Sequence, residues 1–180
     1  PVILPVKIIL QELCRLKLGW DDTIPDEYRS AWLRWLEDLP KLFQLSIPRC
    51  YKPPDFEVKS SELHHFSDAS ESGYGSVSYL RQESHDERIH CSLVLGKARV
   101  TPLKTISIPR LELSAATVAV RVDSMLQTEL DIPLESSTFS TDSTAVIRYV
   151  ENENRRFQTF VANRIAIIRD RSKPVQWRFV

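Results

Sequence analysis

Hydrophobic residues in the first 60 positions recur every three or four residues in two stretches, which is the spacing of amphipathic helices. The first predicted helix covers Ile8–Leu18 and ends at Gly19, and the second covers Tyr28–Leu39. Trp32 and Trp35 lie one turn apart in the second stretch, and we interpret them as packing anchors in preference to a platform for stacking nucleic-acid bases. Several prolines follow, so we place a boundary near residue 60.

From residue 61 the pattern changes to the alternation that is typical of β-strands. Three strands are predicted in succession, at Leu63–Ser70, Ser76–Leu80 and Ile89–Val100. Gly73 and Gly75 mark a tight turn between the first two strands, and a polar segment separates the second from the third. Short polar connections of this kind predict an antiparallel meander.

The rest of the chain alternates between helical and strand patterns. Pro109 suits the first position of a helix that continues to residue 128, and another helix is predicted at 157–170. Because these helices act as crossovers, the fourth and fifth strands should lie parallel to the first. The predicted fold is α/β, a five-stranded mixed sheet with three antiparallel and two parallel strands, flanked by helices. The remaining elements are strands at Ser136–Thr141 and Val175–Val180 and a short helix at Ser143–Val150.

The composition is that of an ordinary globular protein, with 42% hydrophobic and 27% charged residues among 180. This length suits one domain, or one domain with an attached element, and no apolar run is long enough to cross a membrane. The 24 basic residues balance the 24 acidic ones, so no overall field attracts nucleic acid. Residues 148–178 differ, with eight basic and three acidic side chains. We interpret this excess either as solvated helix faces or as a strip that contacts phosphates.

The cysteines and histidines do not form a metal-binding motif. Cys14, Cys50 and Cys91 are odd in number and widely spaced, and none is close enough to His64 or His65 in the sequence to suggest a zinc finger. We therefore expect an intracellular protein without disulfides, whose histidines are polar residues at strand ends.

Three acidic residues occupy the ends of predicted elements. Asp68 lies near the end of the first strand, Asp142 directly follows the fourth strand, and Glu112 lies in the first turn of the long helix. Carboxylates from two neighbouring strands and a helix packed on them converge at one sheet edge, where their oxygens suit Mg²⁺ or Mn²⁺. Two such ions about 4 Å apart activate a water and stabilise a leaving oxygen in phosphodiester cleavage. The alternative roles are turn capping for the aspartates and a favourable helix-dipole position for Glu112.

Several segments carry a resemblance to a known family. They are Phe66-Ser67-Asp68-Ala69-Ser70, Leu103–Leu113, Thr141-Asp142-Ser143-Thr144 and Phe157–Arg164. Together with the leading segment around Trp32–Pro40, they resemble the ribonuclease H-like region and preceding polymerase connection of BEL/Pao-type LTR retrotransposon polyproteins, a family sometimes labelled as peptidases. The resemblance implies a ribonuclease H-like domain over residues 61–180. Residues 1–60 would be a helical connection segment from a reverse transcriptase.

The resemblance also implies hydrolysis of the RNA strand of RNA–DNA hybrids during reverse transcription, with two Mg²⁺ or Mn²⁺ ions. It places the catalytic, metal-binding positions at Asp68, Glu112 and Asp142. Such sites use a fourth carboxylate after the fifth strand, so we expect a domain truncated at its C-terminal end and cut from a longer polyprotein. The implied partners are the hybrid and the polymerase domain of the same polyprotein. The implied setting is a cytoplasmic virus-like particle, with a possible nuclear stage. The weaker candidates for contacts with backbone phosphates are Arg155, Arg156 and Arg164.

Other functions are open alternatives. A decayed domain of this kind would tether the polymerase or bind the hybrid without cleaving it. An aspartic peptidase would need an Asp-Thr/Ser-Gly loop, and Asp142-Ser143-Thr144 lacks the glycine. An integrase-type nuclease would carry its glutamate after the second aspartate, whereas here Glu112 precedes Asp142.

Overall fold

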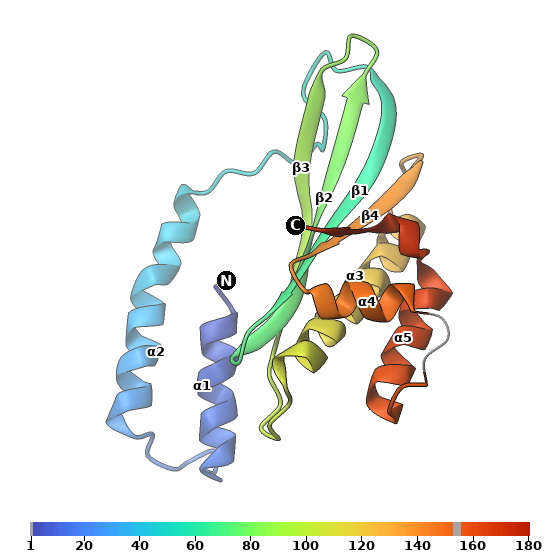
Figure 1. The fold of residues 1–180 in the computed structure, drawn as a ribbon. Helices are drawn as coiled ribbons and strands as arrows, with labels where there is room; N and C mark the ends of the chain where they lie inside the picture. The colour runs from blue at the N-terminus through green and yellow to red at the C-terminus, as the bar shows by residue number, and fades with distance from the viewer. Residues whose placement is uncertain (1, 153–155) are drawn as a thin grey trace. The chain divides into compact units, whose positions relative to one another are not determined.

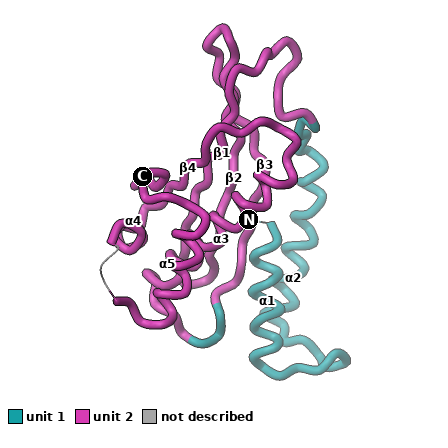
Figure 2. The backbone as a smooth tube through the Cα atoms, turned by 90° about the vertical axis from the view of Figure 1, so that its right-hand side faces the viewer, with its two compact units in different colours: residues 1–49, 102–104 teal, residues 50–101, 105–180 magenta. Residues whose placement is uncertain are grey.

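The computed structural model describes residues 2–152 and 156–180, and the chain divides into two compact units. The first unit consists of residues 1–49 with 102–104, and the second of residues 50–101 with 105–180 (Figure 2). No helix within the described ranges is both long enough and apolar enough to cross a membrane. Residues 50–60, which precede and begin the first strand, belong to the second unit.

Helices form the first unit. α1 (Leu4–Arg15) packs against α2 (Asp26–Asp38), and a 3-10 helix, η1 (Leu39–Gln44), follows α2 directly. α1 begins earlier than predicted because Pro5 fits the first turn of a helix. It also ends earlier, since Lys17 adopts the left-handed conformation (φ 58°) that terminates a helix, two residues before the predicted glycine stop.

The two tryptophans of α2 make contacts within the first unit. The rings of Trp32 and Trp35 lie 5.1 Å apart between centroids, and both side chains are partly buried. Trp35 Nε1 donates a hydrogen bond of 2.8 Å to the carbonyl oxygen of Val2, which precedes α1. These contacts support the interpretation of both residues as packing anchors.

A five-stranded mixed sheet forms the centre of the second unit, as predicted (Figure 1). Its strands are β1 (Val58–Ala69), β2 (Gly73–Ser84), β3 (Ile89–Val100), β4 (Ser136–Thr141) and β5 (Trp177–Phe179). The order across the sheet is β3-β2-β1-β4-β5. The first three strands pair antiparallel, β4 pairs parallel with β1, and β5 pairs parallel with β4. The central position of β1 places its end beside the end of β4.

The glycines after β1 differ from the predicted tight turn. Gly73 closes that turn, because its carbonyl oxygen accepts a 2.7 Å hydrogen bond from Ser70 N–H, but both Gly73 and Gly75 lie in β2. Gly75 is needed for a different reason: a Cβ atom there would lie 2.3 Å from the carbonyl oxygen of Lys97 in β3. The fifth strand is also shorter than predicted, since a 3-10 helix, η2 (Pro174–Gln176), forms immediately before it.

Three helices share a hydrophobic core with the sheet. α3 (Ile108–Glu129) runs along the sheet with α5 (Thr159–Arg171) beside it, and α4 (Thr144–Glu151) follows β4 (Figure 1). The long buried stretch of α3 explains its central place, because residues 111–120 are all buried. Residues from all three helices, β4 and β5 form the main cluster: Leu113, Ala116, Ala119, Val120, Phe139, Val146, Val150, Val161, Ile165, Ile168 and Trp177.

A buried polar network joins α3 to three strands. His65 in β1 is fully buried, with Nδ1 2.7 Å from Ser78 Oγ and Nε2 3.0 Å from Asp123 Oδ1. Ser137 Oγ donates to the same carboxylate at 2.5 Å, and Gln127 Nε2 donates to its other oxygen at 2.9 Å. His65 is therefore a core residue and not the strand-end residue that the sequence predicted. The network fixes the position of α3 on the sheet.

Candidate metal centre

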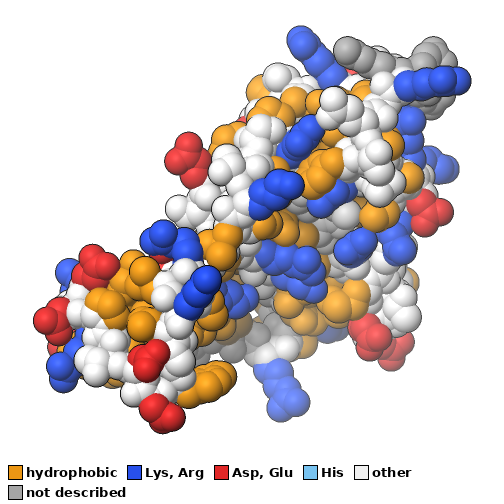
Figure 3. Space-filling model, turned by 90° about the horizontal axis from the view of Figure 1, so that it is seen from below, with side chains coloured by type: hydrophobic (Ala, Val, Ile, Leu, Met, Phe, Trp, Pro, Cys, Tyr) orange, Lys and Arg blue, Asp and Glu red, His pale blue; other side chains and the backbone are white. Residues whose placement is uncertain are grey.

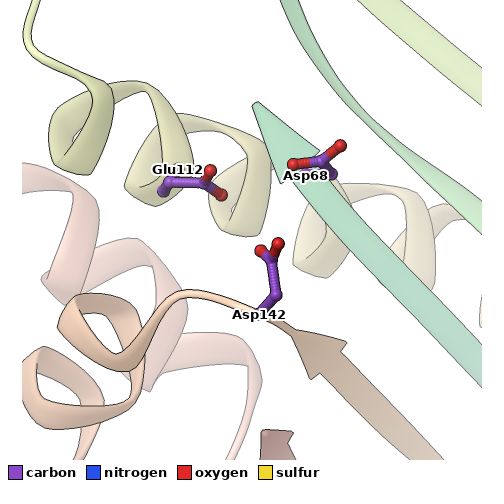
Figure 4. Close-up of side chains that lie close together, drawn as sticks. All are labelled: Asp68, Glu112 and Asp142. Carbon is purple, nitrogen blue, oxygen red and sulfur yellow. The ribbon is translucent and has the colours of Figure 1, made fainter. Parts of the chain in front are cut away.

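The three candidate carboxylates come from three different elements. Asp68 is the second-last residue of β1, and Asp142 directly follows β4. Glu112 lies at the start of the second turn of α3. Because β1 and β4 are parallel and Ser67 pairs with Thr141, both strands end at the same sheet edge. One carboxylate oxygen from each residue lies within 4.8 Å of the others (Figure 4). The fold thus brings together the residues that the sequence singled out.

Glu112 is the buried member of this cluster. Its side chain is 7% exposed, whereas Asp68 and Asp142 are exposed to solvent. Burial raises the pKa of Glu112 to about 7, and the neighbouring charges of Asp68 and Asp142 contribute to the increase, with the backbone N–H of Ala69 opposing it. Within the described part of the chain, Glu112 Oε2 is buried and accepts no hydrogen bond. A buried carboxylate oxygen without a donor is poorly stabilised unless a cation approaches it.

Local hydrogen bonds show which residues cap the turns and helix next to the carboxylates. Ser143 caps α4, since its Oγ accepts from the backbone N–H of Val146 at 3.4 Å, and Thr141 Oγ1 accepts from Ser143 N–H at 3.2 Å. Asp142 is therefore not needed as the helix cap. Asp68 differs, because its Oδ1 accepts a 2.7 Å hydrogen bond from the next backbone N–H, a local contact that also orients the carboxylate.

The donor set matches a hard divalent cation. All three candidate ligands are carboxylates, and their oxygens are close enough to share an ion. Such oxygens suit Mg²⁺ and Mn²⁺, which keep water among their ligands and so favour a site that is open on one side. The exposed aspartates provide that open side, and the unpaired oxygen of Glu112 provides a buried one. The residues present thus fit a metal of this class.

The structure describes two of the three candidate arginines. Arg155 lies outside the described residues, and Arg156 is exposed. Arg164 instead joins α5 to α3, since its Nε donates to Ser114 Oγ at 2.9 Å and its guanidinium lies 3.4 Å from the centroid of the Phe160 ring. Its burial lowers the pKa of Arg164. Arg164 has a structural part in the fold, and contact of these residues with nucleic acid stays a prediction.

The strand order β3-β2-β1-β4-β5, with crossover helices and carboxylates at the shared end of β1 and β4, defines a ribonuclease H-like α/β domain. A family model described as Pao retrotransposon-like RNaseH-like domain matches residues 1–143. The chain belongs to this family, because the match spans most of its length and includes all three carboxylates. The resemblance drawn from the sequence motifs is thus confirmed.

Solved structures with partial similarity include cellular and viral proteins. Ribonuclease H1 from the halophilic archaeon Halobacterium salinarum NRC-1 is 11% identical over 66% of this chain and 83% of its own, with a TM-score of 0.41. LC11-RNase H1 in complex with RNA/DNA hybrid is 9% identical over 67% and 83%, with a TM-score of 0.39. The foamy viral protease-reverse transcriptase in complex with dsDNA is 14% identical over 97% of this chain and 34% of its own, with a TM-score of 0.37. Since these scores are low, the fold assignment rests on strand order and family membership. No curated protein sequence matches the chain.

Proposed function

We propose that this domain hydrolyses the RNA strand of RNA–DNA hybrids by ribonuclease H-type chemistry. The observation that carries the proposal is the convergence of Asp68, Glu112 and Asp142, whose ligand oxygens lie within 4.8 Å of one another. Membership of a retrotransposon family supports the choice of substrate, because the RNA template must be removed from the hybrid that reverse transcription produces.

The three carboxylates would each supply a ligand to divalent metal. Glu112 would supply the buried ligand oxygen, and Asp68 and Asp142 would supply ligands on the open side, where a phosphodiester has access. Two Mg²⁺ or Mn²⁺ ions bound here would supply an activated water and stabilise the departing oxygen. Because Glu112 is buried on α3, water has little access to that side of the site, and the packing of the helix restricts the position of the carboxylate oxygen.

Residues 1–60, whose helices lie in the first unit, are proposed to be a connection to the polymerase domain of the same polyprotein, and residues 61–180 to be the nuclease domain. The first unit leaves many large apolar side chains exposed, both on its helices and in the segments beside them, which is typical of a segment that packs against another protein surface. The most exposed of these side chains are Ile3, Trp20, Phe43, Leu45 and Ile47. The proposed setting for this assembly is the cytoplasm.

Cleavage of labelled substrates tests the proposed function. The full chain should cleave the RNA of a labelled hybrid in Mg²⁺ or Mn²⁺, should spare the same RNA without its DNA partner, and should stop in EDTA. Asp68→Asn and Asp142→Asn should each abolish cleavage, whereas Asp131→Asn, an exposed aspartate outside the site, should leave it unchanged. Cleavage that survives chelation, or that both site variants retain, would contradict the assignment.

Metal binding provides a readout that does not depend on activity. Mg²⁺ should raise the melting temperature of the wild-type chain, and Asp142→Asn should reduce that increase. Metal stabilisation without any cleavage, together with retained hybrid binding, would assign the chain to the alternative of a non-catalytic hybrid-binding domain. If Mg²⁺ does not raise the melting temperature, the proposal that these carboxylates form a metal centre is wrong.

A further inference from the structure

The fully buried ring of His65 in β1 contacts three other elements of the second unit. Its Nδ1 lies 2.7 Å from Ser78 Oγ in β2, and its Nε2–H donates to Asp123 Oδ1 in α3 at 3.0 Å. The ring also stacks on Phe139 in β4, with 5.1 Å between the centroids and 19° between the planes. The side chain is thus held at both ring nitrogens and on one ring face, with Nε2 directed at α3.

The carboxylates of the metal centre lie on β1, after β4 and on α3, which are the elements joined at this ring. Asp68 follows His65 by three residues, and Asp142 follows Phe139 by three residues. Because β1 and β4 are paired in a fixed parallel register, backbone hydrogen bonds already set the two aspartates relative to each other. The position of Glu112 relative to them depends instead on how α3 lies on the strands.

Directional contacts between α3 and the strands are concentrated at Asp123. In the described ranges, every hydrogen bond between a side chain of α3 and a side chain of a strand involves Asp123 or Gln127. Ser137 Oγ of β4 donates to Asp123 Oδ1 at 2.5 Å, and Gln127 Nε2 donates to Asp123 Oδ2 at 2.9 Å. Both oxygens of this carboxylate are therefore held in place.

The rest of the interface does less to fix the rotation of α3 about its axis. Between Glu112 and Asp123, the small side chains of Ala116 and Ala119 are buried in the core. Hydrophobic contact holds a helix against a sheet, but it is non-directional. A rotation of α3 by about 10° would move a carboxylate that lies about 5–6 Å from the helix axis by about 1 Å. A metal centre requires its ligands to be placed within about 0.5 Å.

We propose that His65 and Asp123 are positioning residues of the metal centre, because their hydrogen bond holds the glutamate of α3 at the distance from the two aspartates that shared metal binding requires. The inference rests on the proposed function, since that function supplies the need for a divalent ion. His65 is fully buried, so it acts on the ion only through the carboxylates. Residues that orient metal ligands typically contribute about 10–100-fold to metal affinity or activity.

Binding of Mn²⁺ to the full chain, measured by isothermal titration calorimetry, tests this proposal without any substrate. His65→Phe keeps a ring that can stack on Phe139 but removes both hydrogen bonds, so the Kd for Mn²⁺ should rise about 10–100-fold. His65→Gln, whose amide nitrogen can replace Nε2 as the donor to Asp123, should keep a Kd close to that of the wild type. A role in packing alone would give the opposite order, since phenylalanine suits a hydrophobic core better than glutamine.

Ile168→Ala is the matched control for loss of stability. Ile168 is fully buried in α5, which carries none of the three carboxylates, so this variant should melt at a lower temperature and bind Mn²⁺ as the wild type does. All titrations are made below the melting temperature of every variant. If His65→Phe does not fold, Ser137→Ala combined with Gln127→Ala removes the other two donors to Asp123 and should also raise the Kd.

Cleavage kinetics in Mg²⁺ provide a second readout. His65→Phe should lower kcat and should require more Mg²⁺ for half of the maximal rate. The substitution leaves the molecular surface unchanged, including the basic side chains that gather on the face from which α3 and α5 begin (Figure 3), so the KM for the hybrid should stay at its wild-type value. A higher KM with an unchanged requirement for Mg²⁺ would contradict the positioning role.

Failure of this proposal is distinguishable from failure of the proposed function. Unchanged Kd values for Mn²⁺ in His65→Phe and in the double variant, or equal weakening by Ile168→Ala, would overturn the positioning role and leave the nuclease. Weaker Mn²⁺ binding by His65→Phe, in a chain whose wild type never cleaves, would support the positioning role and contradict the nuclease. A wild-type chain that binds no Mn²⁺ would contradict both proposals.

Discussion

Replacement of Glu112 by glutamine should change how the stability of the protein depends on pH. Burial and the charges of Asp68 and Asp142 raise the pKa of Glu112 to about 7 from an ordinary value of 4.5. Between these two values the folded state holds a proton on this carboxyl that the unfolded state has lost. The stability linked to this proton is therefore fully present below pH 4.5 and is lost as the pH rises through about 7.

The size of the effect follows from the difference between the two pKa values. A shift from 4.5 to about 7 corresponds to at most about 3.4 kcal/mol, at about 1.36 kcal/mol per pKa unit. Because Asp68 and Asp142 are exposed and solvent screens their charges, we expect about 1–2 kcal/mol. Glutamine has nearly the same shape and does not titrate. In the absence of metal, Glu112→Gln should therefore be the more stable chain at high pH.

Urea denaturation at about pH 5 and about pH 8, in EDTA, measures this difference as the free energy of unfolding. Between the two pH values, the wild-type chain should lose about 1–2 kcal/mol more than Glu112→Gln. Mg²⁺ at the higher pH should stabilise the wild-type chain more than the variant, since the ion offsets repulsion among the carboxylates. Glu135→Gln, which replaces an exposed glutamate outside the site, is the control. Equal pH dependence in wild type and Glu112→Gln would refute the reasoning.

Two further predictions concern the fold that supports the site. His65→Ala should lower the free energy of unfolding by about 3 kcal/mol, because it removes a buried ring and leaves the buried Asp123 carboxylate with only Ser137 and Gln127 as donors. His64→Ala, at a partly exposed neighbour, should cost well under half as much. Gly75→Ala should destabilise by about 1–3 kcal/mol, because its Cβ would overlap the Lys97 carbonyl and push β2 from β3. Gly96→Ala, with open space at its Cβ position, should leave the melting temperature nearly unchanged. Equal destabilisation by His65→Ala and His64→Ala would contradict the His65–Asp123 contact, and equal destabilisation by Gly75→Ala and Gly96→Ala would contradict the close approach of Gly75 to Lys97.

The order of strands and helices was predictable from sequence because each element has a distinct hydrophobic period. The alternation in 61–100 and the helical spacing in 157–170 both correspond to elements of the observed sheet and its helices. The candidate carboxylates were also predictable, since Asp68 and Asp142 directly mark strand ends and parallel strands end together. Element boundaries were less accurate. α1 begins earlier than predicted because of Pro5, and the fifth strand is shorter because η2 precedes it. Both differences come from local backbone preferences, which the hydrophobic period does not reveal.

Contacts between distant residues were not predictable in this way. His65 looks like one of two adjacent polar residues in a strand, and only the approach of Asp123, 58 positions away, shows that it is buried and paired. The hydrogen bond from Arg164 of α5 to Ser114 of α3 likewise requires these two helices to lie side by side. Counting charges along residues 148–178 finds Arg164 but does not show that it packs against a residue 50 positions away.

The face of α3 that meets the sheet explains why a buried glutamate is tolerated at the site. Glu112, Ala116, Ala119 and Asp123 recur at spacings of three and four, so they share that face. The two alanines are 1% exposed or less, and their small side chains allow the helix to lie close to the sheet. Asp123 is tied to His65 at one end of this face, and because a helix is rigid over three turns, that link also sets the position of Glu112 at the other end. The repulsion among the carboxylates is thus opposed by a buried network about 16 Å away along the same helix.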